Sequence, residues 1–152
     1  MATFSCISKT RQDLFTWVSA TYPFLVSLPG GMTKMCRMLV ASGNFDVNSL
    51  IDSVILMAKN ENEPTKLADE PKRFTHPDGW GLAYLSDGRW IVKKSTKAIF
   101  KDPSIDKLRN IKTNLLIIHV RKKVGSEISI ENTHPFQIEH PVIGSCVFCH
   151  NG

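Results

Sequence analysis

Apolar residues along the central part of the chain follow two different periods. The stretch CRMLVA at 36–41 is continuous and apolar and ends at Ser42-Gly43-Asn44, which predicts a short strand. Residues 46–60 carry apolar side chains at the spacing of an amphipathic helix, and Asp46 is placed to cap its first turn. The apolar positions of that stretch are Val47, Leu50, Ile51, Val54 and Ala58. The pattern therefore predicts one strand followed by one helix.

Turn signals divide the next part of the chain into a hairpin and a short helix. Residues 80–95 contain two strand-like segments on either side of Ser86-Asp87-Gly88, a sequence typical of a tight β-hairpin. Residues 102–110 predict a short helix, with Asp102 or Ser104 as its N-terminal cap.

Two continuous apolar runs lie near the end of the chain. The runs at 113–120 and 140–148 are typical of strands that are buried on both faces. Polar segments at 61–79 and 121–136 separate the predicted elements and are interpreted as exposed loops. Strands outnumber helices, and neighbouring strands are joined by hairpins. The sequence therefore predicts an α+β domain with helices packed over a mostly antiparallel sheet.

The composition is that of an ordinary globular domain. The 152 residues are 42% apolar and 22% charged, which suits a single domain with one core. The net charge of +5 is modest, and basic residues are scattered apart from Arg121-Lys122-Lys123, so nucleic-acid binding is not expected. No run of about 18 apolar residues occurs, so no membrane-spanning helix is expected.

The first 35 residues differ from the rest of the chain. An apolar stretch at 14–28 follows two basic residues, as in a signal peptide, but Asp13 adjoins it and Pro23 interrupts it. We interpret 1–35 as a leader that comes from a start codon placed too early or from a propeptide, and we favour a true start at Met35. Export through a signal peptide is the alternative.

The four cysteines do not form a disulfide framework, and their uneven spacing suits a reducing cytoplasm. They are Cys6, Cys36, Cys146 and Cys149, and the last two form with His150 the C-x-x-C-H pattern of c-type haem attachment. In a strand these two thiols would lie on opposite faces and roughly 10 Å apart. No second Cys/His pair has the spacing of a zinc site. We therefore expect buried core thiols and no metal or haem; the alternative, an exported haem protein, predicts a covalent adduct.

Four stretches, taken in order, resemble a single protein family. They are MCRML at 35–39, HPDGWGLAY at 76–84, HVRKKVGSEISIENTHPF at 119–136 and FCHNG at 148–152. Together they are similar to the class II glutamine amidotransferase domain, an N-terminal-nucleophile hydrolase, and within it to the small stand-alone members that begin Met-Cys. The resemblance covers 35–152. It implies a four-layer αββα sandwich, which agrees with the α+β class predicted above.

The resemblance also assigns roles within a catalytic site. Attack on a glutamine side-chain amide needs a nucleophile, a base and donors for the oxyanion. Cys36 matches the nucleophile, and as the first residue of a mature chain its own α-amine would serve as the base. Arg121 is implied to bind the α-carboxylate of glutamine, which suits a planar guanidinium. Asn151 and Gly152 match the oxyanion hole, and His134 matches a histidine that shapes the pocket.

Other matching residues are expected to support the structure rather than the chemistry. Asp78-Gly79-Trp80-Gly81 match a D-G-W-G element of the family, in which glycines permit close packing of the backbone and Trp80 fills the core. Asn132 and Thr133 are expected to brace the loop that carries His134.

The implied reaction is hydrolysis of glutamine through a γ-glutamyl thioester on Cys36, which releases ammonia and then glutamate. It needs no cofactor. In most relatives a synthase partner or fused domain accepts the ammonia, so such a partner is expected beside the small-molecule substrate glutamine. Neither nucleic acid nor a membrane is expected as a partner.

Two departures from the family pattern limit these expectations. Cys36 is internal as written, so activity requires its release from 1–35. The family continues past Gly152 with further strands and an acidic residue for the substrate's α-amine. We therefore expect 36–152 to be the N-terminal part of the domain and to have little activity alone. The alternative function is a non-catalytic module of the same fold that binds a partner protein.

Overall fold

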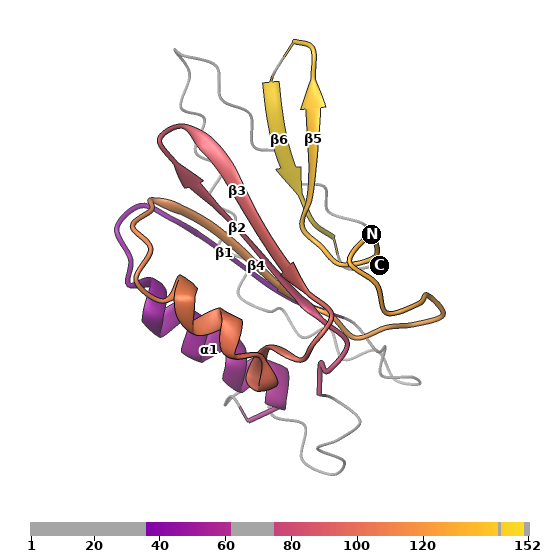
Figure 1. Ribbon diagram of the computed structural model, residues 1–152. Helices are drawn as coiled ribbons and strands as arrows, with labels where there is room; N and C mark the ends of the chain where they lie inside the picture. Colours follow the sequence, from indigo (N-terminus) through magenta and orange to yellow (C-terminus); the bar gives the residue numbers. More distant parts are fainter. Residues whose placement is uncertain (1–35, 62–74, 143, 151–152) are drawn as a thin grey trace, which may run out of the picture.

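The computed structural model describes residues 36–61, 75–142 and 144–150 (Figure 1). In chain order the elements are β1 (Arg37–Ser42), α1 (Val47–Lys59), β2 (Trp80–Ser86), β3 (Arg89–Ser95), η2 (Ile99–Lys101), η3 (Pro103–Leu108), β4 (Leu115–Val120), β5 (Phe136–His140) and β6 (Gly144–Phe148). All strand pairs are antiparallel, so the predicted α+β class with antiparallel sheets is confirmed. The leader at 1–35 and residues 62–74 of the predicted loop lie outside the described residues.

Four strands form the main sheet in the order β1-β4-β2-β3. Val120, the last residue of β4, pairs with Arg37 at the start of β1 and with Trp80 at the start of β2. The chain segments just outside these three strand ends are therefore neighbours at one end of the sheet. That end carries Cys36 and Arg121, two of the predicted site residues.

The predicted helix is confirmed, and α1 covers one face of the main sheet (Figure 1). Asp46 caps its first turn, because its carboxylate accepts a hydrogen bond from the Ser49 N–H at 2.9 Å. The buried residues on the helix are Val47, Ile51, Val54 and Ala58, and their cluster includes Leu82, Leu116 and Ile118 of the sheet. Burial of each larger side chain contributes roughly 1.5–3 kcal/mol to folding.

A second sheet, formed by β5 and β6, lies on the opposite face of the main sheet (Figure 1). Val147 and Cys149 pack against Ala83 and Ile117 of the main sheet. Successive strand residues point to opposite faces, so Ile117 lies in this cluster while Ile118 lies in the cluster with α1. The described residues thus form a helix layer, a four-stranded layer and a two-stranded layer.

The hairpin predicted at 80–95 is also confirmed. Ser86 pairs with Arg89 across a two-residue turn. The turn residues Asp87 and Gly88 have φ of 49° and 73°. Two successive positive φ values match the right-handed twist of the strands that they join.

The prediction at the end of the chain is wrong in part. The strand predicted at 140–148 begins only at Gly144, because His140 ends β5 and Pro141 and Val142 belong to the turn. β5 has no counterpart in the prediction. Four of its five residues are exposed, so no apolar run marks it as a strand.

The remaining helical turns are short. The helix predicted at 102–110 is the 3₁₀-helix η3, and Asp102 is its cap, because its carboxylate accepts a hydrogen bond from the Ser104 N–H at 3.0 Å. η2, directly before it, was not predicted. Within the described ranges the longest helix, α1, has 13 residues, so none can cross a bilayer.

Candidate active site

Backbone hydrogen bonds hold three chain segments together at the end of the main sheet. The Asp78 N–H donates to the Arg121 carbonyl oxygen at 3.2 Å, and the Arg121 N–H donates to the Gly79 carbonyl oxygen at 2.8 Å. The Lys123 N–H donates to the Asp78 carboxylate at 2.9 Å. The pairing of β2 with β4 therefore continues past the strands and fixes the backbone of 121–123. Asp78 acts here as a structural acceptor, as predicted.

Cys36 lies at this end as a partly buried thiol. Its Sγ accepts a hydrogen bond from the Lys122 N–H at 3.4 Å and lies 3.5 Å from the Lys122 carbonyl oxygen. Burial raises the pKa of the thiol above its ordinary value, while the Lys122 N–H and the charge of Arg121 act in the opposite direction. The thiol is therefore protonated at neutral pH, and a base must remove its proton before it can attack.

Arg121 is buried, with 4% of its surface exposed. Its Nη2 donates to the Ser126 hydroxyl and to the Glu127 carbonyl oxygen, both at 2.7 Å. Its Nη1 is buried and has no hydrogen-bond partner among the described residues. Although it begins the basic triplet Arg121-Lys122-Lys123, Arg121 is therefore not a solvated surface arginine. A buried cation with an unused donor is suited to an anionic ligand.

The two glycines of the D-G-W-G element make room for neighbouring backbone. Gly79 has φ of +127°, and a Cβ there would lie 2.8 Å from the Ser95 carbonyl oxygen. A Cβ on Gly81 would collide with the carbonyl oxygen of His134. Trp80, between them, is buried on the helix side of the sheet, where its Nε1–H donates to Asp102 at 3.1 Å. The predicted structural roles of these glycines and of Trp80 are confirmed.

The segment before β5 folds back onto this end of the sheet through its own polar side chains. The Thr133 hydroxyl donates to the Ser129 carbonyl oxygen at 2.7 Å, and the Asn132 amide donates to the Glu127 carbonyl oxygen at 3.3 Å. Thr133 is fully buried. These bonds brace the loop that carries His134, as predicted.

Three histidine rings contact one another between the two sheets. The His134 ring centre lies 4.8 Å from that of His119 and 4.5 Å from that of His150, in edge-to-face arrangements. Burial, and then the nearby His134, lowers the pKa of His119 to about 3. Burial, and then His150, lowers the pKa of His134 to about 4. At neutral pH both rings are uncharged. Within the described ranges no group of three or more His, Cys, Asp or Glu is arranged to hold a metal ion.

The structure brings some of the predicted residues together, and others lie outside the described residues. At the end of β4 the Cys36 thiol accepts a hydrogen bond from Lys122, the residue after Arg121, and the charge of Arg121 acts on the thiol. The backbone of His134 packs against Gly81 of β2. The predicted oxyanion residues, 151 and 152, lie outside the described residues. His119 is missing from the prediction. Its signal in the sequence is that it is the one polar residue inside the apolar strand LLIIHV.

The two cysteines of the haem-like pattern are buried. Cys146 lies within β6, and Cys149 follows it, where its thiol donates to the Met38 thioether. Burial raises the pKa of Cys149 to about 12. Neither these cysteines nor Cys36 form a disulfide with a described residue. The prediction of small core thiols is confirmed.

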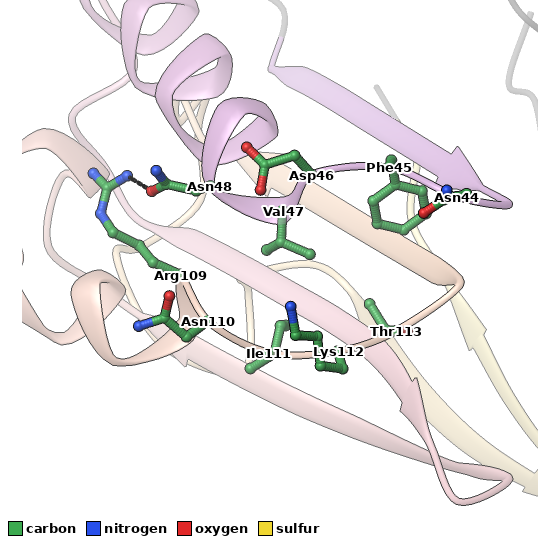
Figure 2. A pocket seen from close by; sticks show the side chains of 10 residues that line it. All are labelled: Asn44, Phe45, Asp46, Val47, Asn48, Arg109, Asn110, Ile111, Lys112 and Thr113. Atoms are coloured by element: carbon green, nitrogen blue, oxygen red, sulfur yellow. Dashed lines mark hydrogen bonds between the residues drawn. The ribbon is translucent and has the colours of Figure 1, made fainter.

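A cavity of about 380 Å³ opens at the other end of the main sheet (Figure 2). Its lining residues come from the start of α1 and from the segment before β4; they are Asn44, Phe45, Asp46, Val47, Asn48, Arg109, Asn110, Ile111, Lys112 and Thr113. Arg109 already binds Asn48, Asp52 and Asp106 through its guanidinium. None of the predicted site residues lines this cavity.

Comparison with known proteins identifies the family. The family described as "Glutamine amidotransferases class-II" matches residues 56–152, which is well over half of the chain. The match begins after Cys36 and includes Arg121, the histidine cluster and the end of the chain. The chain therefore belongs to the class II glutamine amidotransferases.

Two of the three curated relatives described here carry names that agree with this assignment. A Haemophilus influenzae protein named "Putative glutamine amidotransferase" is 35% identical over 109 residues, 64% of this chain and 36% of the relative. An uncharacterized protein of Methanocaldococcus jannaschii is 37% identical over 81 residues, 51% of this chain and 22% of the relative. Escherichia coli "Putative glutamine amidotransferase YafJ" is 30% identical over 66 residues, 42% of this chain and 26% of the relative. The chain thus spans little more than a third, at most, of the relatives it matches.

Proposed function

We propose that this protein hydrolyses the side-chain amide of glutamine through a thioester on Cys36. The observation that carries the proposal is the position of the Cys36 thiol beside a buried arginine that has an unused donor. A thiol supplies the nucleophile, and the arginine supplies a site for the α-carboxylate of an amino acid. Membership of the family makes glutamine the substrate of this proposal.

The raised pKa of Cys36 sets a requirement for a base. His119 and His134 have pKa values of about 3 and about 4 and are too weak as bases to take up a thiol proton. An α-amine titrates near pH 8. When Cys36 is the first residue, its own α-amine belongs to the same residue as the sulfur. We therefore include in the proposal that Cys36 becomes the N-terminus, by removal of 1–35 or by a start at Met35.

The proposed reaction has two steps. The Cys36 sulfur attacks the amide carbon, the α-amine takes the thiol proton, and this proton passes to the leaving nitrogen as ammonia departs. Water then attacks the thioester, which releases glutamate and restores the thiol. Asn151 and Gly152 would donate hydrogen bonds to the oxyanion in both steps, worth about 3–4 kcal/mol for one such donor. His150, directly before them, belongs to the histidine cluster.

The proposal extends to the rest of the protein. In a four-layer αββα sandwich, the observed helix, main sheet and second sheet would form three layers, and a second helix layer would cover β5 and β6. Residues 36–152 would be the N-terminal part of this domain. A synthase partner or a further domain would accept the ammonia.

The experiment measures glutamate release from glutamine by the protein purified from its own cells, with its N-terminus determined by mass. We expect release by the parent and by Cys146→Ala, a matched control for loss of a buried thiol, and none by Cys36→Ala. A Cys36→Ala variant as active as the parent would refute the proposal. An inactive parent that retains 1–35 would favour a non-catalytic module instead.

A further inference from the structure

His119 is a buried polar residue to which the proposed reaction assigns no step. Its side chain is fully buried on β4, and neither ring nitrogen has a hydrogen-bond partner among the described residues. Burying a polar group without a hydrogen bond costs free energy, typically about 1–3 kcal/mol in proteins. An aliphatic side chain would serve a sheet core better at this position. The ring contact that His119 makes is with His134.

The neighbours of His119 across the sheet explain why His134 can reach it. His119 pairs with Gly81 on β2, and Gly81 pairs with Lys94 on β3. Gly81 has no side chain, and the backbone of His134 and Pro135 occupies the space that a Cβ would fill. The His134–Pro135 peptide therefore lies in a notch between His119 and Lys94, with Gly81 as its floor. The centre of the His150 ring lies 4.5 Å from that of His134.

We propose that His119 is a positioning residue: through its ring contact with His134 it holds His150, the residue directly before the predicted oxyanion donors, in place against β4. This inference rests on the proposed function, because it concerns the predicted oxyanion donors. His119 does not touch the substrate in this account. It acts through the rings of His134 and His150 and through the peptide bond that follows His150.

The contact between His119 and His134 works because both of these rings are neutral. Edge-to-face packing of His119, His134 and His150 brings ring centres within 5 Å, so a proton on any ring would place positive charge beside its neighbours. The groups that face the cluster are also basic: His76 and Arg121 act on His119, and Lys94 and Arg121 act on His134. Acid is therefore expected to loosen the cluster and with it the segment after His150.

Two substitutions separate ring contact from hydrogen bonding and from loss of volume. His119→Leu fills the space without a ring, and His119→Phe restores a ring without nitrogen atoms. His140→Ala removes an exposed histidine at the end of β5 and serves as the control. Thermal unfolding of each full-length variant establishes that it is folded.

The kinetic readout is glutamate release with kcat and KM separated. We expect His119→Leu to lower kcat by about 10- to 100-fold with KM within about threefold, because misplaced oxyanion donors weaken transition-state binding. His119→Phe should recover most of kcat, and its activity should fall at lower pH than that of the parent. Equal loss in His119→Leu and His119→Phe, an effect on KM alone, or no effect in either would overturn the inference.

A second readout does not need activity. In glutamine-free protein, the backbone amide NMR signals of His150 and Gly152 should shift in His119→Leu and return toward the parent positions in His119→Phe. Unmoved signals in His119→Leu overturn the inference even if the enzyme is active. If the parent releases no glutamate, the proposed function fails, and these signals alone decide whether His119 positions the segment.

Discussion

The polar side chains at the two ends of the main sheet differ in burial and in hydrogen bonding. At the end where β4 finishes, Arg121 is 4% exposed and has an Nη1 without a partner in the described part of the chain, and His119 is fully buried. At the end where β4 begins, Arg109 is exposed to solvent for a quarter of its side chain and binds two carboxylates and an amide oxygen. One end buries polar groups without satisfying them, and the other satisfies them at the surface.

This difference indicates which end carries the function. The cavity of about 380 Å³ lies at the end where β4 begins. The Cys36 thiol, the buried guanidinium and the histidine rings lie at the end where β4 finishes. Unsatisfied buried polar groups lower stability, so a folded protein tolerates them chiefly where a ligand or a reaction uses them. The proposed site therefore lies away from the cavity, at the end of the sheet that has the unsatisfied groups.

The largest effect is expected from Gly81→Ala, matched with Gly43→Ala at the opposite end of the sheet. A Cβ on Gly81 meets the His134 backbone, which cannot move without displacing the loop before β5. A Cβ on Gly43 meets nothing within 4 Å, although its φ of +103° is unfavourable for alanine. We expect urea unfolding to give a loss of about 3 kcal/mol or more for Gly81→Ala and about 1 kcal/mol for Gly43→Ala. Equal losses would contradict the notch described above.

Arg121→Ala should affect substrate binding more than any other single arginine substitution. Removal of the charged donor is expected to raise KM for glutamine by about 100-fold, the loss of a charge-assisted hydrogen-bonded pair. Arg121→Lys should recover little, since one ammonium cannot donate to the loop and to a carboxylate in the fork geometry of a guanidinium. Steady-state kinetics measure both. An unchanged KM in Arg121→Ala would remove this residue from the site.

The histidine cluster predicts how stability depends on pH. The pKa of His119 is about 3 in the folded protein against an ordinary value of 6.5 for an exposed histidine, so the unfolded chain binds more protons between these values. Stability from His119 is therefore fully present above pH 6.5 and is lost as the pH falls, by about 2 kcal/mol at pH 5. The free energy of unfolding, measured at pH 8 and at pH 5, should change less between the two pH values for His119→Phe than for the parent. The same pH dependence in His119→Phe and parent would argue against a buried neutral ring.

The smallest effect is expected from Arg109→Ala. Its contacts with Asp52 and Asp106 are surface ion pairs, in which both carboxylates are more than half exposed. We expect a loss of about 0.5–1 kcal/mol that shrinks in high salt, with no change in the kinetics. A larger kinetic change in Arg109→Ala than in Arg121→Ala would reverse the comparison between the two ends.

The sequence predicts the elements whose signals are local and periodic. Residues 46–60 reveal α1 and its cap Asp46, because burial against one sheet face imposes a helical spacing. The 80–95 hairpin is equally clear from its turn. β5 is not, since its exposed side chains leave no apolar run.

Candidate site residues could be named from the sequence where a family motif includes them, and not where only packing brings them together. Cys36 and Arg121 follow from the motifs, but the burial of Arg121 and its unused donor appear only once the loop before β5 folds over it. His119 has no motif role in the prediction. The role proposed for it depends on its ring contact with His134 and on the contact of His134 with His150, residues that are far away in sequence, so no local pattern reports them.

The central claim, that Cys36 attacks glutamine as an N-terminal residue, is tested most directly by covalent trapping. The protein purified from its own cells is treated with an electrophilic glutamine analogue, digested, and mapped by mass spectrometry. The account predicts one modified peptide that begins at Cys36, carries the adduct on that thiol and retains an unblocked α-amine, with competition by glutamine. An adduct on Cys146 or Cys149, or an adduct on Cys36 in a peptide that still contains preceding residues, would contradict it.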